Sequence, residues 1–230
     1  MSLPHSVAHQ AGGALFGALA GVFRRRPLHS TGIAFRGELI LTSDAPGAGL
    51  VRGTVLGEAG TRAVTARFSR GFGLPEPLPE ILSLGLKIHG VREQDLLLTA
   101  SGRKPVLRHL LTGGRDHLGA HYTTILPFEA GGRRILVGVA PRSAAAPGFD
   151  DLEHLARTSG IHLCLRVAQP LRPWRDVGEI VLRGAPLSDV QERALAFTTE
   201  QDAGGIRAVG VVNAARGGAY AAAQRVRPRR

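Results

Sequence analysis

Short strand-like segments, separated by turns rich in glycine and proline, dominate this sequence from Gly32 onward. Many short strands at close spacing are typical of a closed antiparallel barrel or a sandwich. The sequence therefore predicts an α+β protein that is mainly β. The predicted strands are Ile33–Thr42, Leu50–Leu56, Thr61–Ser69, Leu82–His89, Asp95–Thr99, His121–Phe128, Arg133–Ala140, Ile161–Ala168 and Val177–Leu182.

Helices are expected to be few. Asp150–Thr158 begins with two carboxylates, which suit a helix N-terminus, and Gly160 can end it. The other predicted helices are Val106–Leu111, Leu187–Leu195 with Ser188 or Asp189 as its cap, and Val209–Val226. We expect one domain over 1–230, with an N-terminal arm (1–28), a barrel (29–183) and C-terminal helices (184–230). Glu129–Gly132 is predicted to be a four-residue hairpin loop.

The composition excludes several classes of protein. Cys164 is the single cysteine, so neither a disulfide framework nor a cysteine-based zinc cluster can form within the chain. The formal net charge is +11, which suits an anionic partner, carboxylates held by arginine, or a compositional bias without function. Two tyrosines and Trp174 are too few for a platform on which nucleic-acid bases stack.

No segment reaches the ~18 apolar residues that a membrane-spanning helix needs. The longest candidate, Ala11–Phe23, is followed by Arg24–Arg26 and is predicted to be an N-terminal helix or arm. A cytoplasmic protein is therefore expected. His117 and His121 have the spacing of two metal ligands, but no third ligand lies near them in the sequence, so no metal site is predicted there.

One helical pattern near the C-terminus points to specific chemistry. Arg216 and Tyr220 are four residues apart and would share one helix face, with Arg227 further along the same side. An arginine beside a tyrosine favours the phenolate form. A phenolate is a hard anionic ligand, and tyrosine is one of the axial ligands of haem iron. Arginines could in turn hold carboxylates such as the two haem propionates.

Three patterns in the chain resemble the haem catalases and their catalase-like relatives. The first is R-x-x-H-x-x-G, which Arg26, His29 and Gly32 match, followed by Gly37. The second is R-F-S at the end of a strand, which matches Arg67–Ser69. The third is R-x-x-x-Y followed by Q-R-x-R, and it matches Arg216, Tyr220, Gln224, Arg225 and Arg227. The patterns occur in the family's order and span most of the chain.

The resemblance implies a catalase-like antiparallel β-barrel of about eight strands, haem as cofactor and a peroxide as substrate, and it leaves a homo-oligomer open. It implies that Tyr220 is the proximal iron ligand and Arg216 its partner. His29 would be the distal acid–base group, tuned by Ser69. The haem propionates would contact Arg26, Arg67 and Arg227.

The chain also departs from the family pattern. Thr99 stands where the family has its distal asparagine, and Thr99 and Ser101 offer hydroxyls that could orient a ligand. Gly217-Gly218 weakens the helix of Tyr220 by about 1 kcal/mol per glycine relative to alanine. These departures favour a peroxidase-like activity on hydrogen peroxide or an organic hydroperoxide, in a response to oxidative stress, over fast catalase turnover.

Two alternatives remain open at this stage. The chain could be an inert or haemless barrel of the same fold that binds an apolar ligand or a protein partner, in which case it would not be an enzyme. The positive charge alone would also allow nucleic-acid binding, which requires a steep dependence of affinity on salt concentration.

Overall fold

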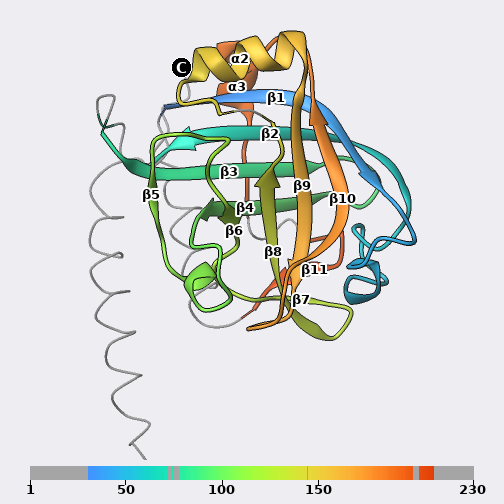
Figure 1. The fold of residues 1–230 in the computed structure, drawn as a ribbon. Coiled ribbons are helices and arrows are strands. Elements are labelled where there is room, and N and C mark those ends of the chain that lie inside the picture. The colour runs from blue at the N-terminus through green and yellow to red at the C-terminus, as the bar shows by residue number, and fades with distance from the viewer. Residues whose placement is uncertain (1–30, 72–73, 75–77, 144, 199–201, 210–230) are drawn as a thin grey trace, which may run out of the picture.

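The computed structural model describes residues 31–71, 74, 78–143, 145–198 and 202–209, and antiparallel strands dominate this part of the chain (Figure 1). The barrel strands are β1 (Thr31–Leu41), β2 (Gly60–Arg70), β3 (Glu80–Ile88), β4 (Gln94–Ala100), β6 (Tyr122–Thr123), β8 (Arg133–Pro141), β9 (Ile161–Ala168) and β10 (Arg175–Leu182). Three short strands lie beside them: β5 (Gly113–Gly114), β7 (Phe128–Ala130) and β11 (Ile206–Ala208). The helices are the 3₁₀ turns η1 (Ala48–Leu50) and η2 (Leu107–His109), and α2 (Phe149–Thr158) and α3 (Asp189–Ala194).

The sheet closes on itself. Each barrel strand pairs antiparallel with the next in the order β1-β2-β3-β4-β6-β8-β9-β10. The last strand then returns to the first, so that Gly37 on β1 faces Leu182 on β10. This closure leaves no unpaired edge in the barrel. The predicted mainly-β barrel is therefore confirmed, and the sandwich is not formed.

Alternation along each strand separates the inside of the barrel from the outside. On β2, Val64, Ala66 and Phe68 point into the core, so Thr65 and Arg67 point outward. β3 and β4 follow the same pattern, with leucine or isoleucine at alternate positions. The interior is consequently a continuous apolar core to which all eight barrel strands contribute.

The predicted strand Leu50–Leu56 is wrong. The chain here forms η1 and a series of turns, with Gly53 at φ +80° and the Thr54 hydroxyl donating to the Val51 carbonyl over 2.7 Å. Val51 and Val55 are nevertheless buried and belong to the core. The apolar residues that imitated a strand therefore pack against the barrel core from a loop.

The predicted strand His121–Phe128 is only partly formed. Its first part pairs as β6, but Ile125 has φ +60°, which an extended strand cannot accommodate, and pairing resumes only at β7. The predicted four-residue loop Glu129–Gly132 is also shorter than expected, because β7 continues to Ala130. Gly131 and Gly132 alone make the turn, with φ of +54° and +75°, as a type I′ hairpin requires.

Two of the predicted helices are confirmed with small shifts at their ends. α2 begins one residue before the predicted Asp150, and α3 is capped by Ser188, whose hydroxyl accepts from the Gln191 backbone amide. Both lie at the same end of the barrel (Figure 1). The predicted helix Val106–Leu111 is only the single turn η2, and Val209–Val226 lies outside the described residues. Of the helices described here, none is long and apolar enough to cross a membrane.

Candidate functional site

A row of hydroxyl side chains crosses the outer face of β2, β3 and β4. Ser69 on β2 is paired in register with Ser83 on β3, and Ser83 is paired with Thr99 on β4. Paired residues point to the same face of a sheet, and neighbouring strands lie about 4.8 Å apart, so Ser69 and Thr99 are about 10 Å from each other. The structure thus brings two of the predicted site residues, Ser69 and Thr99, onto one surface.

Ser83, in the middle of this row, was not predicted as a site residue. Its side chain is buried, and its hydroxyl has no hydrogen-bond partner among the described residues. A buried hydroxyl without a partner costs free energy, which indicates that it lies where a ligand or water can satisfy it. A signal was present in the sequence: within Leu82–Leu86, leucines alternate with Ser83 and Gly85, which are small.

Arg67 lies on the same outer face, two residues before Ser69. Its guanidinium binds Glu192 of α3, with Nε 2.9 Å and Nη2 2.8 Å from the same carboxylate oxygen. This contact joins residues far apart in the sequence, and Glu192 was not predicted. The positive charge that the resemblance assigns to a haem propionate is therefore already partly compensated by a carboxylate of the chain itself.

The two glycines of the first motif have structural reasons to be glycine. A Cβ on Gly32 would lie 2.7 Å from Cζ of Arg67, because the guanidinium crosses directly over this position. A Cβ on Gly37 would collide with the backbone carbonyl of Val181 on β10. Gly32 therefore makes room for the Arg67 side chain, and Gly37 allows the close approach of the strands that close the barrel.

The segment that contains α3 covers part of this outer face. Past the helix, the Phe197 ring lies against Gly85, 3.2 Å from the place where a Cβ would be. The Thr198 amide donates to Asp95, which also binds Lys87 over 2.6 Å. Burial raises the pKa of Asp95, although the bond to Lys87 acts in the opposite direction. The outer face is thus polar and still largely removed from solvent.

Most of the other predicted site residues lie outside the described residues. These are Arg26, His29, Arg216, Tyr220 and Arg227. Ser101, whose hydroxyl was expected to help orient a ligand, is described, and it is already bonded to the Thr123 hydroxyl over 2.9 Å. Of the two hydroxyls considered at the end of β4, Thr99 is therefore the better candidate to contact a ligand.

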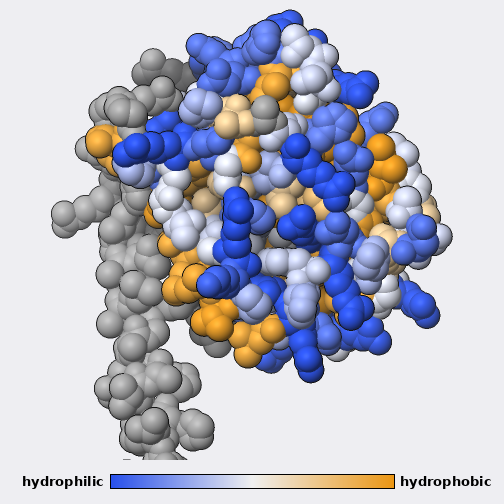
Figure 2. Space-filling view, viewed as in Figure 1, coloured by the Kyte–Doolittle hydropathy of each residue, from blue (hydrophilic) through white to orange (hydrophobic). Residues whose placement is uncertain are grey.

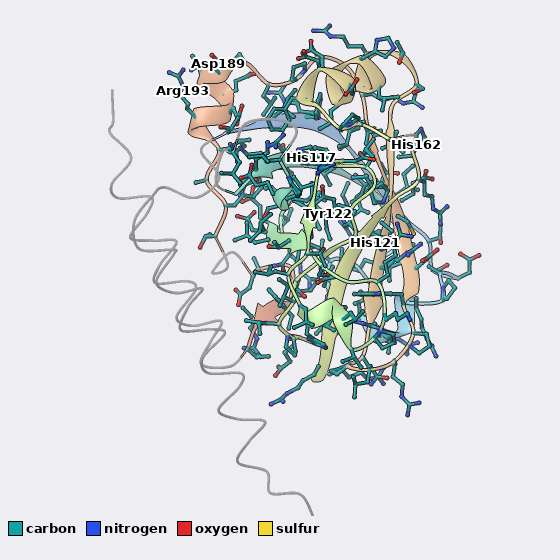
Figure 3. The ribbon with its side chains drawn as sticks, turned by 60° about the vertical axis from the view of Figure 1, so that its left-hand side comes forward. His117, His121, Tyr122, His162, Asp189 and Arg193 are labelled. Carbon is teal, nitrogen blue, oxygen red and sulfur yellow. The ribbon has the colours of Figure 1, made fainter. Side chains whose placement is uncertain are left out.

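A second polar cluster lies inside the barrel (Figure 3). Tyr122 donates a hydrogen bond to the His117 carbonyl, and the His117 ring is stacked on Phe149 and has no partner for Nε2 among the described residues. Burial, with help from the charge of Arg70, lowers the pKa of His117 to about 4. His117 is consequently neutral at pH 7, as an apolar core requires.

His121 lies directly before β6. Burial and the charges of Arg103 and Arg166 lower its pKa to about 4. Within the described ranges, no group of three or more histidine, cysteine, aspartate or glutamate side chains is placed to hold a metal ion.

Solved structures provide the comparison that decides the fold. A fungal catalase matches with a TM-score of 0.67 and 15% identity, and a bacterial catalase with 0.69 and 16%. Catalase A from Saccharomyces cerevisiae matches with a TM-score of 0.65 and 15% identity. Each match covers 93% of this chain. The fold is that of the catalases.

This catalase-like chain spans less than two thirds of the proteins it resembles, covering 62%, 60% and 64% of the three chains, respectively. No family model matches the sequence, and no curated protein matches it either. At 15–16% identity, the similarity establishes the arrangement of the backbone only. The chemistry depends on which residues this chain carries.

The outer face of this catalase-like barrel can do two things chemically. Its hydroxyl row can orient a small polar ligand, because each serine or threonine can donate one hydrogen bond and accept others. The small side chain of Ser83 leaves the backbone of β3 close to the surface beside the Phe197 ring, which already covers Gly85, so a flat group would lie over Ser83.

Proposed function

We propose that this chain is a haem-binding protein of the catalase fold that acts on a peroxide. Its activity would be peroxidase-like, on hydrogen peroxide or an organic hydroperoxide, in preference to fast catalase turnover. The observation that carries the proposal is the row Ser69–Ser83–Thr99 on the outer face of a barrel of this fold, in which the Ser83 hydroxyl has no partner among the described residues.

A flat cofactor would lie over Ser83, the small residue at the centre of this face on β3. The Phe197 ring, which covers the neighbouring Gly85, would supply an apolar edge. Lys87 lies 5.6 Å from the centre of that ring and adds a positive charge near the same edge. A bound haem supplies an iron that changes its oxidation state, which is what cleavage of a peroxide O–O bond requires.

The residues around the cofactor would hold it and manage protons. The Tyr220 phenolate oxygen would bind the iron, and Arg216 would favour the phenolate. Carboxylates of the cofactor would be held by Arg26, Arg67 and Arg227. His29 would carry a proton from one peroxide oxygen to the other, since a histidine gains and loses a proton near neutral pH. Ser69 would orient His29.

Thr99 supports the choice of a peroxidase-like activity. A threonine hydroxyl can donate one hydrogen bond, whereas the amide of an asparagine can donate two. The peroxide would thus be held less firmly than by the asparagine that the resemblance leads one to expect there. Thr99→Asn should raise the rate of hydrogen peroxide disproportionation relative to peroxidase turnover, and an unchanged ratio of the two rates would remove Thr99 from this role.

The test begins with the absorption spectrum of protein purified from hemin-supplemented cells. We expect a strong Soret band that Tyr220→Phe abolishes. Tyr122→Phe is the matched control, because Tyr122 is the chain's other tyrosine and lies inside the barrel. His29→Ala should keep the Soret band and lose peroxide turnover. A full haem complement in Tyr220→Phe would contradict the assignment of the iron ligand.

A second candidate function rests on one specific contact. Because Glu192 already binds Arg67 on the outer face, this face could be a scaffold without haem that binds an apolar ligand or a protein partner. Protein that is purified colourless and takes up no added hemin would favour this candidate, and a stoichiometric Soret band would reject it.

A further inference from the structure

A separate cavity lies between a loop and a hairpin of the barrel. It has a volume of about 400 Å³ and is lined by Gly49, Leu50, Arg52, Gly131 and Arg133. Gly49 and Leu50 belong to η1, and Gly131 is in the turn between β7 and β8. Figure 2 shows hydrophilic side chains gathered over the lower right of this view, where the β7–β8 hairpin lies in Figure 1. A volume of this size is within the range of small-molecule sites.

The two walls are held together by close backbone contacts. Arg133 Nη1 donates to the Gly49 carbonyl over 2.9 Å, which ties the hairpin to η1. A Cβ on Gly131 would lie 2.8 Å from the Arg52 carbonyl oxygen, so only glycine permits this approach. The Gly49 Cβ position, in contrast, meets no atom of the described residues within 4 Å. The cavity therefore has a fixed frame and an unobstructed side.

The cavity carries positive charge that no described carboxylate compensates. None of the five lining residues is acidic. Arg52 makes no side-chain hydrogen bond or ion pair with any described residue, and Arg133 makes only the bond to the Gly49 carbonyl. Two guanidinium groups thus border one cavity without a carboxylate from the described part of the chain.

Two carboxylates that are close in sequence to the lining residues are already bound elsewhere. Glu58, which follows this loop, binds Arg62 and Arg92 over 3.0 and 2.6 Å. Glu129, which precedes the hairpin turn, binds Arg207 over 2.9 Å. Within the described part of the chain, these pairs leave the positive charges at the cavity without a counterion, which favours an anionic ligand.

We propose that this cavity binds a small phosphomonoester. A phosphate ester carries close to two negative charges at neutral pH, which matches the two arginines, and a guanidinium can bind phosphate oxygens with two parallel hydrogen bonds. The remaining volume accommodates a small organic group next to Leu50. The site is distinct from the outer face of β2–β4, so the proposal does not depend on haem.

The test is isothermal titration of the full-length protein with inorganic phosphate and with glycerol 3-phosphate. We expect both to bind, the ester more tightly. Arg52→Gln should weaken binding about tenfold, since it removes one charge-assisted contact. Because Arg52 makes no side-chain hydrogen bond or ion pair with a described residue, this variant should keep its melting temperature. Arg52→Lys keeps the charge but loses the planar fork, so its affinity should fall between those of the wild type and Arg52→Gln.

Arg115→Gln is the matched control. Arg115 is exposed, does not line the cavity, and its removal changes the net charge by the same amount. Its affinity should equal that of the wild type. An equal loss in Arg115→Gln and Arg52→Gln would reduce the effect to general attraction and overturn the site. The absence of binding by either ligand would also overturn it, and so would binding only to phosphatidic acid vesicles, which would identify a membrane surface in place of a soluble ester.

Discussion

The inside of the barrel and the outer face of β2–β4 are both buried, but for different reasons. The inside is mainly apolar, apart from the pair His117 and Tyr122, and is sealed by the strands that form it, with Phe68 fully removed from solvent. The outer face carries hydroxyls and charges, and its described cover comes from the segment around α3, more than 100 residues away in sequence. The barrel interior is buried because of the strand pattern, whereas the outer face is buried only because distant parts of the chain come into contact.

The largest expected effect concerns the interior. Phe68 makes edge contacts with the rings of Phe35, His117 and Tyr122, so Phe68→Ala should lower the free energy of unfolding by about 3–5 kcal/mol. Urea unfolding measures this. Phe197→Ala on the outer face should cost less than half as much, because Phe197 is only partly buried. Equal losses would mean that the two regions are equivalent.

The next effect is a pH dependence that originates inside the barrel. The pKa of His117 is lowered to about 4 by burial, so the unfolded chain binds a proton there below pH ~6.5 while the native protein does not. The free energy of unfolding should therefore fall as the pH decreases, by about 2 kcal/mol between pH 7 and pH 5.

His117→Gln should remove this contribution in urea unfolding measured at both pH values. His121→Gln tests a similar contribution from His121, whose pKa is also lowered to about 4 by burial. A pH dependence that His117→Gln leaves unchanged would contradict the assignment to the interior histidine.

A smaller effect tests the cover of the outer face. Glu192→Gln replaces the charged partner of Arg67 in a largely buried ion pair and should cost about 1 kcal/mol in thermal or urea unfolding. Asp189→Asn on the same helix is the control. Its pair with Arg193 is 3.7 Å long and almost fully exposed (Figure 3), so its loss should cost only about 0.3 kcal/mol, the contribution of a carboxylate in the first turn of a helix. If both variants cost the same, the Arg67–Glu192 contact does not hold the cover in place.

The smallest effect is expected at Ser83. Its buried hydroxyl has no described partner, so Ser83→Ala in the haem-free protein should leave the free energy of unfolding unchanged or raise it by up to about 1 kcal/mol. Ser101→Ala is the comparison, because it breaks the bond to the Thr123 hydroxyl and should cost about 1 kcal/mol. A clear loss of stability in Ser83→Ala would show that its hydroxyl is satisfied within the protein.

The barrel could be predicted because its strands carry their own pattern. Ile161–Ala168 matches β9 at both ends, since its alternating side chains and flanking glycine define a strand locally. Leu50–Leu56 has similar apolar content, yet it is a loop, because Gly53 adopts a positive φ and its valines reach the core without pairing. Composition alone does not distinguish an apolar loop from a strand.

The site was predictable only in part, and the reason is distance along the chain. Ser69 and Thr99 were identified one by one, but their alignment through Ser83 depends on the register of three strands. The partner of Arg67 depends on where a helix after the last barrel strand comes to lie. Neither the register of the three strands nor the position of this helix can be predicted from the local sequence.

The pairing of Gly37 on β1 with Leu182 on β10 also means that the barrel can close only after β10 has been synthesised. During synthesis, β1 emerges before the other barrel strands, and β10, which closes the ring, emerges after them. Until then the growing sheet has two bare edges, each able to pair with another chain. Closure over such a long separation is slow, because the entropy of the large loop is lost before the contacts form. The nascent chain is therefore most vulnerable to aggregation just before β10 is available.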